Sequence, residues 1–194
     1  MNVRIDRKYN LENLGYLTPY LYNMEYVLFF GSLLGYCRDK NLLELDDDVD
    51  FYVNIKHRNE IHDVLKKAGF NITIEESCFV QGSRTIDGID TYVDFYLYED
   101  MPDNDYILER WGFYGAPQSP AAHLHVPKRI IYPIAWGEIG NIKFKVPSNI
   151  EECCRFLYGS EYDTPFVKGA DYSIIIKNNK PTFRIGDKCS TSAH

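Results

Sequence analysis

The stretch LLELDDDVDFYV, residues 42–53, places four aspartates within five positions between apolar runs. From Asp48 onward, polar and apolar residues alternate strictly, which predicts a β-strand with Asp48 and Asp50 on one face and Val49 and Phe51 on the other. A solvated acidic turn is the ordinary interpretation of such a run, but it does not explain the alternation. The pattern therefore favours a strand that aims two carboxylates in one direction while its other face lies in the core.

A calcium-binding EF-hand loop is another interpretation of the same residues, because Asp46, Asp48 and Asp50 match its first three acidic positions. The sixth position of that loop requires glycine and is Phe51, and the twelfth requires glutamate and is His57. The EF-hand interpretation is therefore rejected.

The chain as a whole has 194 residues, of which 45% are hydrophobic and 25% charged. This predicts a single domain over residues 1–194, with a motif-bearing core from about 25 to 165 and a C-terminal extension at 166–194. The net charge of -7 disfavours binding of a nucleic-acid polymer. No apolar run approaches the roughly 18 residues of a membrane span, and the N-terminus lacks an apolar stretch of signal-peptide length. We expect a cytoplasmic protein without a membrane span.

The segments around the aspartates suggest both strands and helices. Residues 25–30 predict a strand that stops at Gly31, with Ser32 capping a following helix. Residues 58–70 have the spacing of an amphipathic helix, and residues 71–76, 78–82 and 91–98 that of strands. The last of these strands carries Asp94 at its middle.

The second half of the chain is less regular. Residues 100–128 predict a long loop, with a short helix around Asp105 to Trp111. Two apolar segments flank the sequence GEIG as a β-hairpin, and a helix follows that begins with a capping box of Ser148 and Glu151 and ends at Gly159.

Three carboxylates on two strands point to a metal centre. Asp48 and Asp50, together with Asp94 from a later strand, can hold two divalent cations about 3.5–4 Å apart, which bind phosphate oxygens and activate a hydroxyl. Gly31 and Ser32 at a helix N-terminus offer a place for phosphate groups. These features predict metal-dependent phosphoryl or nucleotidyl transfer.

The order of strand, Gly-Ser, helix and aspartate-bearing strand is the pattern of the nucleotidyltransferase superfamily. Within it, FFGSLLGYCRDKNLLELDDDVDF resembles the hallmark of the LicD and fukutin-related family, commonly GTLLGAxRxxxFIPWDDDID. VPSNIEECCRFLYGSEYDTP resembles the family segment that ends in YGxxWxxP. The resemblance covers about residues 26–58 and 128–165. Glu44-Leu45 replaces the usual Pro-Trp, and Tyr162 stands where Trp is common.

The resemblance implies an α/β (α+β) fold with a nucleotidyltransferase-like twisted mixed β-sheet flanked by helices. Family members transfer phosphocholine or a phospho-alditol such as ribitol phosphate from a CDP-linked donor to a sugar hydroxyl, releasing CMP. By resemblance, Asp48 and Asp50 bind Mg²⁺ or Mn²⁺ at a two-metal site, and Asp94 is the third ligand or the general base. Gly31, Ser32 and Arg38 contact the donor phosphates.

Two alternatives stay open. The same fold could transfer a nucleotidyl group from an NTP to a small molecule or protein, releasing pyrophosphate, or the domain could be a non-catalytic binding module. Asp46 and Asp47 are expected to support the ligands or to have a purely local role.

Several other residues are expected to lie outside the site. His123 and His125 are interpreted as loop residues, and Trp111 and Trp136 as packing residues rather than as platforms for a base or a sugar. The basic residues are interpreted as surface charges: Arg84, Lys128, Arg129, Lys143 and Lys145. The five cysteines are interpreted as free thiols, without a nucleophilic role: Cys37, Cys78, Cys153, Cys154 and Cys189.

Overall fold

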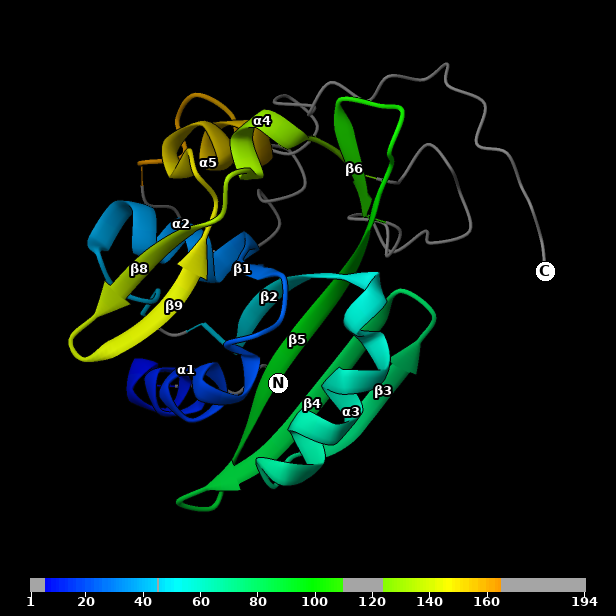
Figure 1. The fold of residues 1–194 in the computed structure, drawn as a ribbon. Coiled ribbons are helices and arrows are strands. Elements are labelled where there is room, and N and C mark those ends of the chain that lie inside the picture. The colour runs from blue at the N-terminus through cyan, green and yellow to red at the C-terminus, as the bar shows by residue number, and fades with distance from the viewer. Residues whose placement is uncertain (1–5, 45, 110–123, 165–194) are drawn as a thin grey trace.

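The structure is a computed structural model and describes residues 6–44, 46–109 and 124–164 (Figure 1). Trp111, His123, Cys189 and the predicted C-terminal extension lie outside the described residues. The elements of the first part are α1 (Arg7–Leu21), β1 (Tyr26–Leu28), α2 (Phe30–Asp39), β2 (Asp48–Asn54), a 3-10 turn (Ile55–His57) and α3 (Arg58–Lys67). The remaining elements are β3 (Asn71–Glu76), β4 (Phe79–Ile86), β5 (Ile89–Asp100), β6 (Tyr106–Glu109), β7 (Leu124–Pro127), α4 (Lys128–Ile131), β8 (Ala135–Ile139), β9 (Ile142–Val146) and α5 (Ile150–Tyr158).

The main sheet is mixed, as predicted. Its strand order is β1-β2-β5-β4-β3, with β6 and β7 continuing from the far end of β5. β2 and β5 are parallel, whereas the other pairs are antiparallel. The hairpin of β8 and β9 forms a separate sheet, which lies beside α1 in Figure 1. The mixed α/β fold is therefore confirmed, while the prediction of one domain over the whole chain stays a prediction.

The two aspartate-bearing strands lie at the centre of the core. Val49, Phe51 and Val53 are fully buried, as the alternation predicts. Tyr52 on the opposite face is also fully buried, because its ring stacks on Phe29 at 4.1 Å between centroids. Beyond its first residue, β2 is therefore buried on both faces, and a charged side chain on it needs polar partners.

A polar network around Glu25, the residue that precedes β1, lies beside this core. Glu25 accepts hydrogen bonds from the hydroxyls of Tyr98 and Tyr132 and from Asn54, and it pairs with Lys56. Burial alone would raise the pKa of Glu25, but the hydrogen bonds from its partners outweigh burial and lower it to about 2. The carboxylate therefore stabilises the fold in its ionised form.

Two predicted helix starts are wrong. Ser32 does not cap α2, because the helix begins at Phe30 with Phe29 as its N-cap, and the Ser32 side chain is used elsewhere. The capping residue of α5 is Asn149, whose side chain accepts from the backbone N–H of Glu152 at 3.1 Å, so the box of Ser148 and Glu151 is shifted by one residue. Ser148 instead donates to the Tyr132 carbonyl.

The prediction of a loop over residues 100–128 is wrong within the described part. β6 pairs with the last residues of β5, and β7 pairs with β6. The predicted short helix near Asp105 is likewise replaced by β6, since backbone pairing along β5 outweighs a weak local preference. α1 was not anticipated, and its buried residues include the polar Asn10, Asn13 and Thr18, which obscure its apolar stripe.

Candidate functional site

The β1–α2 junction is fastened to β2 through Ser32 and Asp50. The Ser32 hydroxyl accepts from the Asp50 backbone N–H at 2.9 Å, and the Ser32 backbone N–H donates to Asp50 Oδ2 at 3.3 Å. Phe29 N–H donates to the Asp50 carbonyl at 3.2 Å. Ser32 and Asp50 are both buried, so these bonds hold the Asp50 carboxylate against the first turn of α2.

Gly31 makes this close approach possible. A Cβ atom added at this position would lie 2.6 Å from Asp46 Oδ2 and 3.3 Å from Asp50 Oδ2. Real Cβ atoms do not come as near to a carboxylate oxygen as the first distance. The glycine therefore leaves the space that two carboxylates occupy, which is a reason for glycine independent of backbone flexibility.

Three carboxylates converge beside this turn. One oxygen from each of Asp46, Asp48 and Asp50 lies within 4.8 Å of the other two, a grouping that could hold a metal ion. Asp46 and Asp50 are almost fully buried, and the Asp46 backbone carbonyl accepts from Asn10 of α1 at 3.1 Å. Asp46 thus joins the predicted pair more closely than the sequence interpretation expected. Its signal was the i, i+2, i+4 spacing that also suggested an EF-hand.

Asp94 lies beside this acidic cluster, the name used below for Asp46, Asp48 and Asp50. It pairs in register with Asp50 on the parallel strands β2 and β5 and is almost fully buried. Its Oδ1 accepts from Gln81 Nε2 at 2.9 Å. The structure therefore brings together all three predicted acids, with Asp94 on the neighbouring strand rather than within the tight cluster.

The closely spaced carboxylates affect the pKa of Asp48. Burial raises the pKa of Asp48 well above its usual range, and the carboxylates of Asp50, Asp94, Asp46 and Asp47 raise it further. A divalent cation would relieve this repulsion, and carboxylate oxygens are the donors that Mg²⁺ and Mn²⁺ prefer. The residues present therefore fit a divalent cation.

Arg38 is the predicted site residue farthest along α2. It lies seven residues beyond Gly31, about 10 Å along the helix axis. Its guanidinium bonds to neighbouring Asp39 through Nε and through a terminal nitrogen, each at 3.3 Å. The predicted phosphate contacts of Gly31, Ser32 and Arg38 stay predictions.

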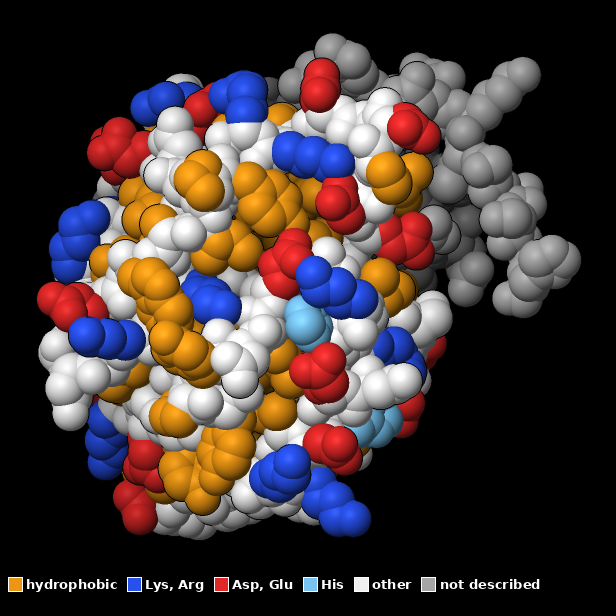
Figure 2. Space-filling view, viewed as in Figure 1, with side chains coloured by type: hydrophobic (Ala, Val, Ile, Leu, Met, Phe, Trp, Pro, Cys, Tyr) orange, Lys and Arg blue, Asp and Glu red, His pale blue; other side chains and the backbone are white. Residues whose placement is uncertain are grey.

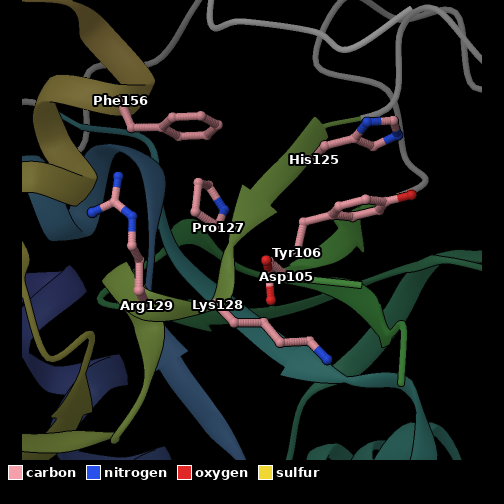
Figure 3. A pocket seen from close by; sticks show the side chains of 7 residues that line it. All are labelled: Asp105, Tyr106, His125, Pro127, Lys128, Arg129 and Phe156. Atoms are coloured by element: carbon pink, nitrogen blue, oxygen red, sulfur yellow. The ribbon is translucent and has the colours of Figure 1, made fainter. Parts of the chain in front are cut away.

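A separate cavity of about 790 Å³ lies between β6, β7, α4 and α5. Figure 3 shows Phe156 on one side and the Tyr106 and His125 rings on the other, with the two rings stacked 4.8 Å apart. Lys128 pairs with Asp100 and Arg129 with Glu152, so both cations are engaged. None of the acidic cluster lines this cavity.

Three of the residues that were expected to lie outside the site have local partners. Trp136 is half exposed and packs on Tyr22, Arg84 pairs with Glu12, and Lys145 donates to the carbonyls of Tyr22 and Met24. On the face that Figure 2 shows, the described Lys and Arg side chains are scattered among acidic and apolar ones and form no large basic patch. The described cysteines, Cys37, Cys78, Cys153 and Cys154, are free thiols.

The described helices include none with the length and apolar character needed to cross a membrane.

Similarity to solved structures supports the assignment of a mixed α/β fold. A solution structure of the antibiotic-resistance factor ANT(2'')-Ia is similar, with 12% identity, a TM-score of 0.51, and coverage of 87% of this chain and 85% of that one. A crystal structure of ANT(2")-Ia with adenylyl-2"-tobramycin has 12% identity, a TM-score of 0.52 and coverage of 88% and 89%. The lincomycin-bound lincosamide antibiotic adenylyltransferase LnuA has 15% identity, with coverage of 90% of this chain and 94% of that one. Its TM-score of 0.49 is too low to support the fold assignment.

Within that fold the family is defined by sequence. Residues 23–149 match the model described as "LicD/FKTN/FKRP, nucleotidyltransferase domain". The match spans more than half of the chain, and the protein belongs to this family. It is accordingly a transferase by family. No curated protein matches the chain.

Proposed function

We propose that this protein transfers phosphocholine or a phospho-alditol, such as ribitol phosphate, from a CDP-linked donor to a sugar hydroxyl and releases CMP. Membership of the LicD family supports this reaction type. The observation that carries the proposal is the convergence of Asp46, Asp48 and Asp50 beside Gly31, at the start of α2. Such a centre binds a cation and the phosphates of a donor at one place.

The acids would divide into two roles. Asp48 and Asp50, with Asp46, would hold Mg²⁺ or Mn²⁺, which when bound neutralises the donor diphosphate and the departing CMP. Asp94, on the adjacent strand, is the general base of the proposal and accepts the proton of the acceptor hydroxyl. The acceptor oxygen then bonds to the phosphorus that bears choline or the alditol, and the bond from that phosphorus to the CMP oxygen breaks.

The residues around the acids fix their positions. Ser32 holds Asp50 through two hydrogen bonds, and Gly31 leaves the space for Asp46. The positive end of the α2 helix dipole favours an anion, so this turn is the proposed place for donor phosphate. Arg38 is proposed as a further phosphate contact.

Nucleotidyl transfer from an NTP is the second candidate. It is favoured by the fold similarity to ANT(2")-Ia, whose structure is described as a complex with adenylyl-2"-tobramycin. In that reaction the attacked phosphorus belongs to the nucleotide, and pyrophosphate leaves instead of CMP. A non-catalytic binding module is the third candidate and would release neither product.

Phosphorus NMR separates the three. The protein is incubated in Mg²⁺ buffer with CDP-choline, CDP-ribitol, CDP-glycerol, CTP or ATP and a panel of sugar acceptors. We expect CMP from one CDP-linked donor, and none from that donor with Asp50→Asn. Pyrophosphate from CTP or ATP would replace the first proposal with the second. Equal CMP release by wild type and Asp50→Asn would refute the assigned site.

A further inference from the structure

A row of polar side chains crosses the main sheet at the level of the candidate site. Asp50 on β2 is in register with Asp94 on β5, and Asp94 is in register with Gln81 on β4. Residues that are paired in register project from the same face of a sheet. Gln81 is thus the next side chain beyond the acids, although the sequence interpretation assigned it no role.

Two hydrogen bonds fix the Gln81 amide. Its Nε2 donates to Asp94 Oδ1 at 2.9 Å, and its Oε1 accepts from the Thr73 hydroxyl at 2.9 Å. The reverse amide orientation would turn the Gln81 oxygen toward the Asp94 carboxylate, which has no proton to donate when ionised. Asp94 and Thr73 therefore select one orientation between them.

The Thr73 side chain reaches Gln81 because β3 is irregular at that point. Ile72 pairs with Gly82 and Ile74 with Gln81, so Thr73 is an extra residue between two consecutive pairs. A β-bulge of this kind redirects a side chain. β3 is exposed throughout, and the neighbouring Ile72 and Ile74 are more than one-third exposed, so Thr73 is not needed to fill the core.

We infer that Gln81 is a positioning residue for Asp94, with Thr73 holding its amide in the orientation that donates to the carboxylate. The inference rests on the proposed function, in which Asp94 acts as the general base. An amide is suited to this place because it restrains a carboxylate without adding a positive charge that would compete with a bound cation. Without Gln81, Asp94 would lose this hydrogen bond, and repulsion from the acidic cluster would favour rotation of its carboxylate away from Asp50.

The hydrogen bond itself can be tested without activity. The chain has two glutamines, Gln81 and Gln118, so protein labelled with ¹⁵N in glutamine side chains gives two amide pairs, and Gln81→Leu identifies which belongs to Gln81. We expect one Gln81 amide proton to exchange at least tenfold more slowly than the other, and Asp94→Asn or Thr73→Val to abolish this difference. Equal exchange of both protons in the wild type would overturn the inference.

The functional consequence requires turnover with the donor found active. Gln81→Leu should lower kcat about ten- to a hundredfold while donor KM stays within about twofold. Thr73→Val should lower kcat by about threefold to fivefold, the effect of one neutral hydrogen bond. Thr85→Val is the matched control, because the Thr85 hydroxyl also donates to a side chain on a neighbouring strand, that of Asp90 on β5, away from the acidic cluster. It should leave kcat unchanged.

A double-mutant cycle separates positioning from general destabilisation. If Gln81 acts through Asp94, Gln81→Leu should have less than a twofold effect in the Asp94→Asn background. Full additivity of the two losses, or wild-type kcat in Gln81→Leu, would overturn the positioning role while the proposed function stands. Failure of the proposed function gives a different result, because Asp48→Asn and Asp50→Asn would then keep wild-type turnover. That result would also overturn the positioning role of Gln81.

Discussion

Replacing Gly31 with alanine should lower turnover at the site while leaving the stability of the fold almost unchanged. Gly31 lies in the first turn of α2 and its φ is negative, so its backbone conformation accepts alanine. The new Cβ would lie 2.6 Å from Asp46 Oδ2. Reaching an ordinary contact of 3.4 Å requires the Asp46 carboxylate to move by about 0.8 Å.

The expected magnitudes follow from this shift. Misplacing a reacting or ligating group by about 1 Å costs up to roughly a hundredfold in rate, so turnover should fall about ten- to a hundredfold. Alanine gains up to about 1 kcal/mol over glycine in a helix, which offsets part of the strain. The melting temperature should therefore stay within about 3 °C of wild type.

The assay compares Gly31→Ala with Gly15→Ala by differential scanning fluorimetry, Mn²⁺ titration and product release. Gly15 lies in α1, where an added Cβ would meet only the flexible end of Ile142 at 3.2 Å. The control should keep both Mn²⁺ affinity and turnover. Wild-type turnover in Gly31→Ala would refute the packing argument, and a drop in melting temperature above about 10 °C would show that the glycine serves the fold instead.

Three further predictions concern stability. Gly35→Ala places a Cβ 2.5 Å from the Leu43 backbone nitrogen and should cost about 3 kcal/mol in urea unfolding; a loss below 1 kcal/mol would contradict it. Because the pKa of Glu25 is lowered in the folded protein, its ionised carboxylate stabilises the fold above about pH 4.5. This stabilisation is lost as the pH falls toward 2 and the carboxylate becomes protonated. Because Glu25 is partly exposed, Glu25→Gln should remove about 1–2 kcal/mol of that pH dependence, and an unchanged slope would refute this. Asn149→Ala should cost about 1 kcal/mol through the lost cap of α5, whereas Glu151→Ala should cost little.

The parts of the fold that the sequence predicted are those with a strong local pattern. The alternation around Asp48 and Asp94 correctly predicted β2 and β5, because each strand needs apolar residues on at least one face. α3 was also predicted, since its apolar spacing and Gly69, at a φ of 72°, define both its face and its end.

The parts that failed depend on distant partners. β6 and β7 form because β5 extends beyond the core and offers a free edge, which no local pattern around Tyr106 reveals. Ser32 has the residue type and the position of a helix N-cap, whereas the true partner of its hydroxyl is the Asp50 backbone, 18 residues away.

The candidate site was predicted in composition but not in arrangement. Asp48, Asp50 and Asp94 follow from strand alternation, and their meeting depends on the parallel pairing of β2 with β5. The inclusion of Asp46 depends on the turn before β2, and the contact with Gln81 depends on the register of β4 and the bulge at Thr73. These are tertiary features that a linear motif does not encode.

The most direct test of the central claim is an electron paramagnetic resonance titration of Mn²⁺ into wild type, Asp46→Asn, Asp48→Asn and Asp50→Asn, with Asp90→Asn, at the start of β5, as an acidic control. We expect saturable binding by wild type and the control, and at least tenfold weaker binding by each of the three cluster variants. Wild-type affinity in all three cluster variants, or no binding by wild type with a CDP-linked donor present, would contradict the claim that these aspartates form the metal centre of the transferase.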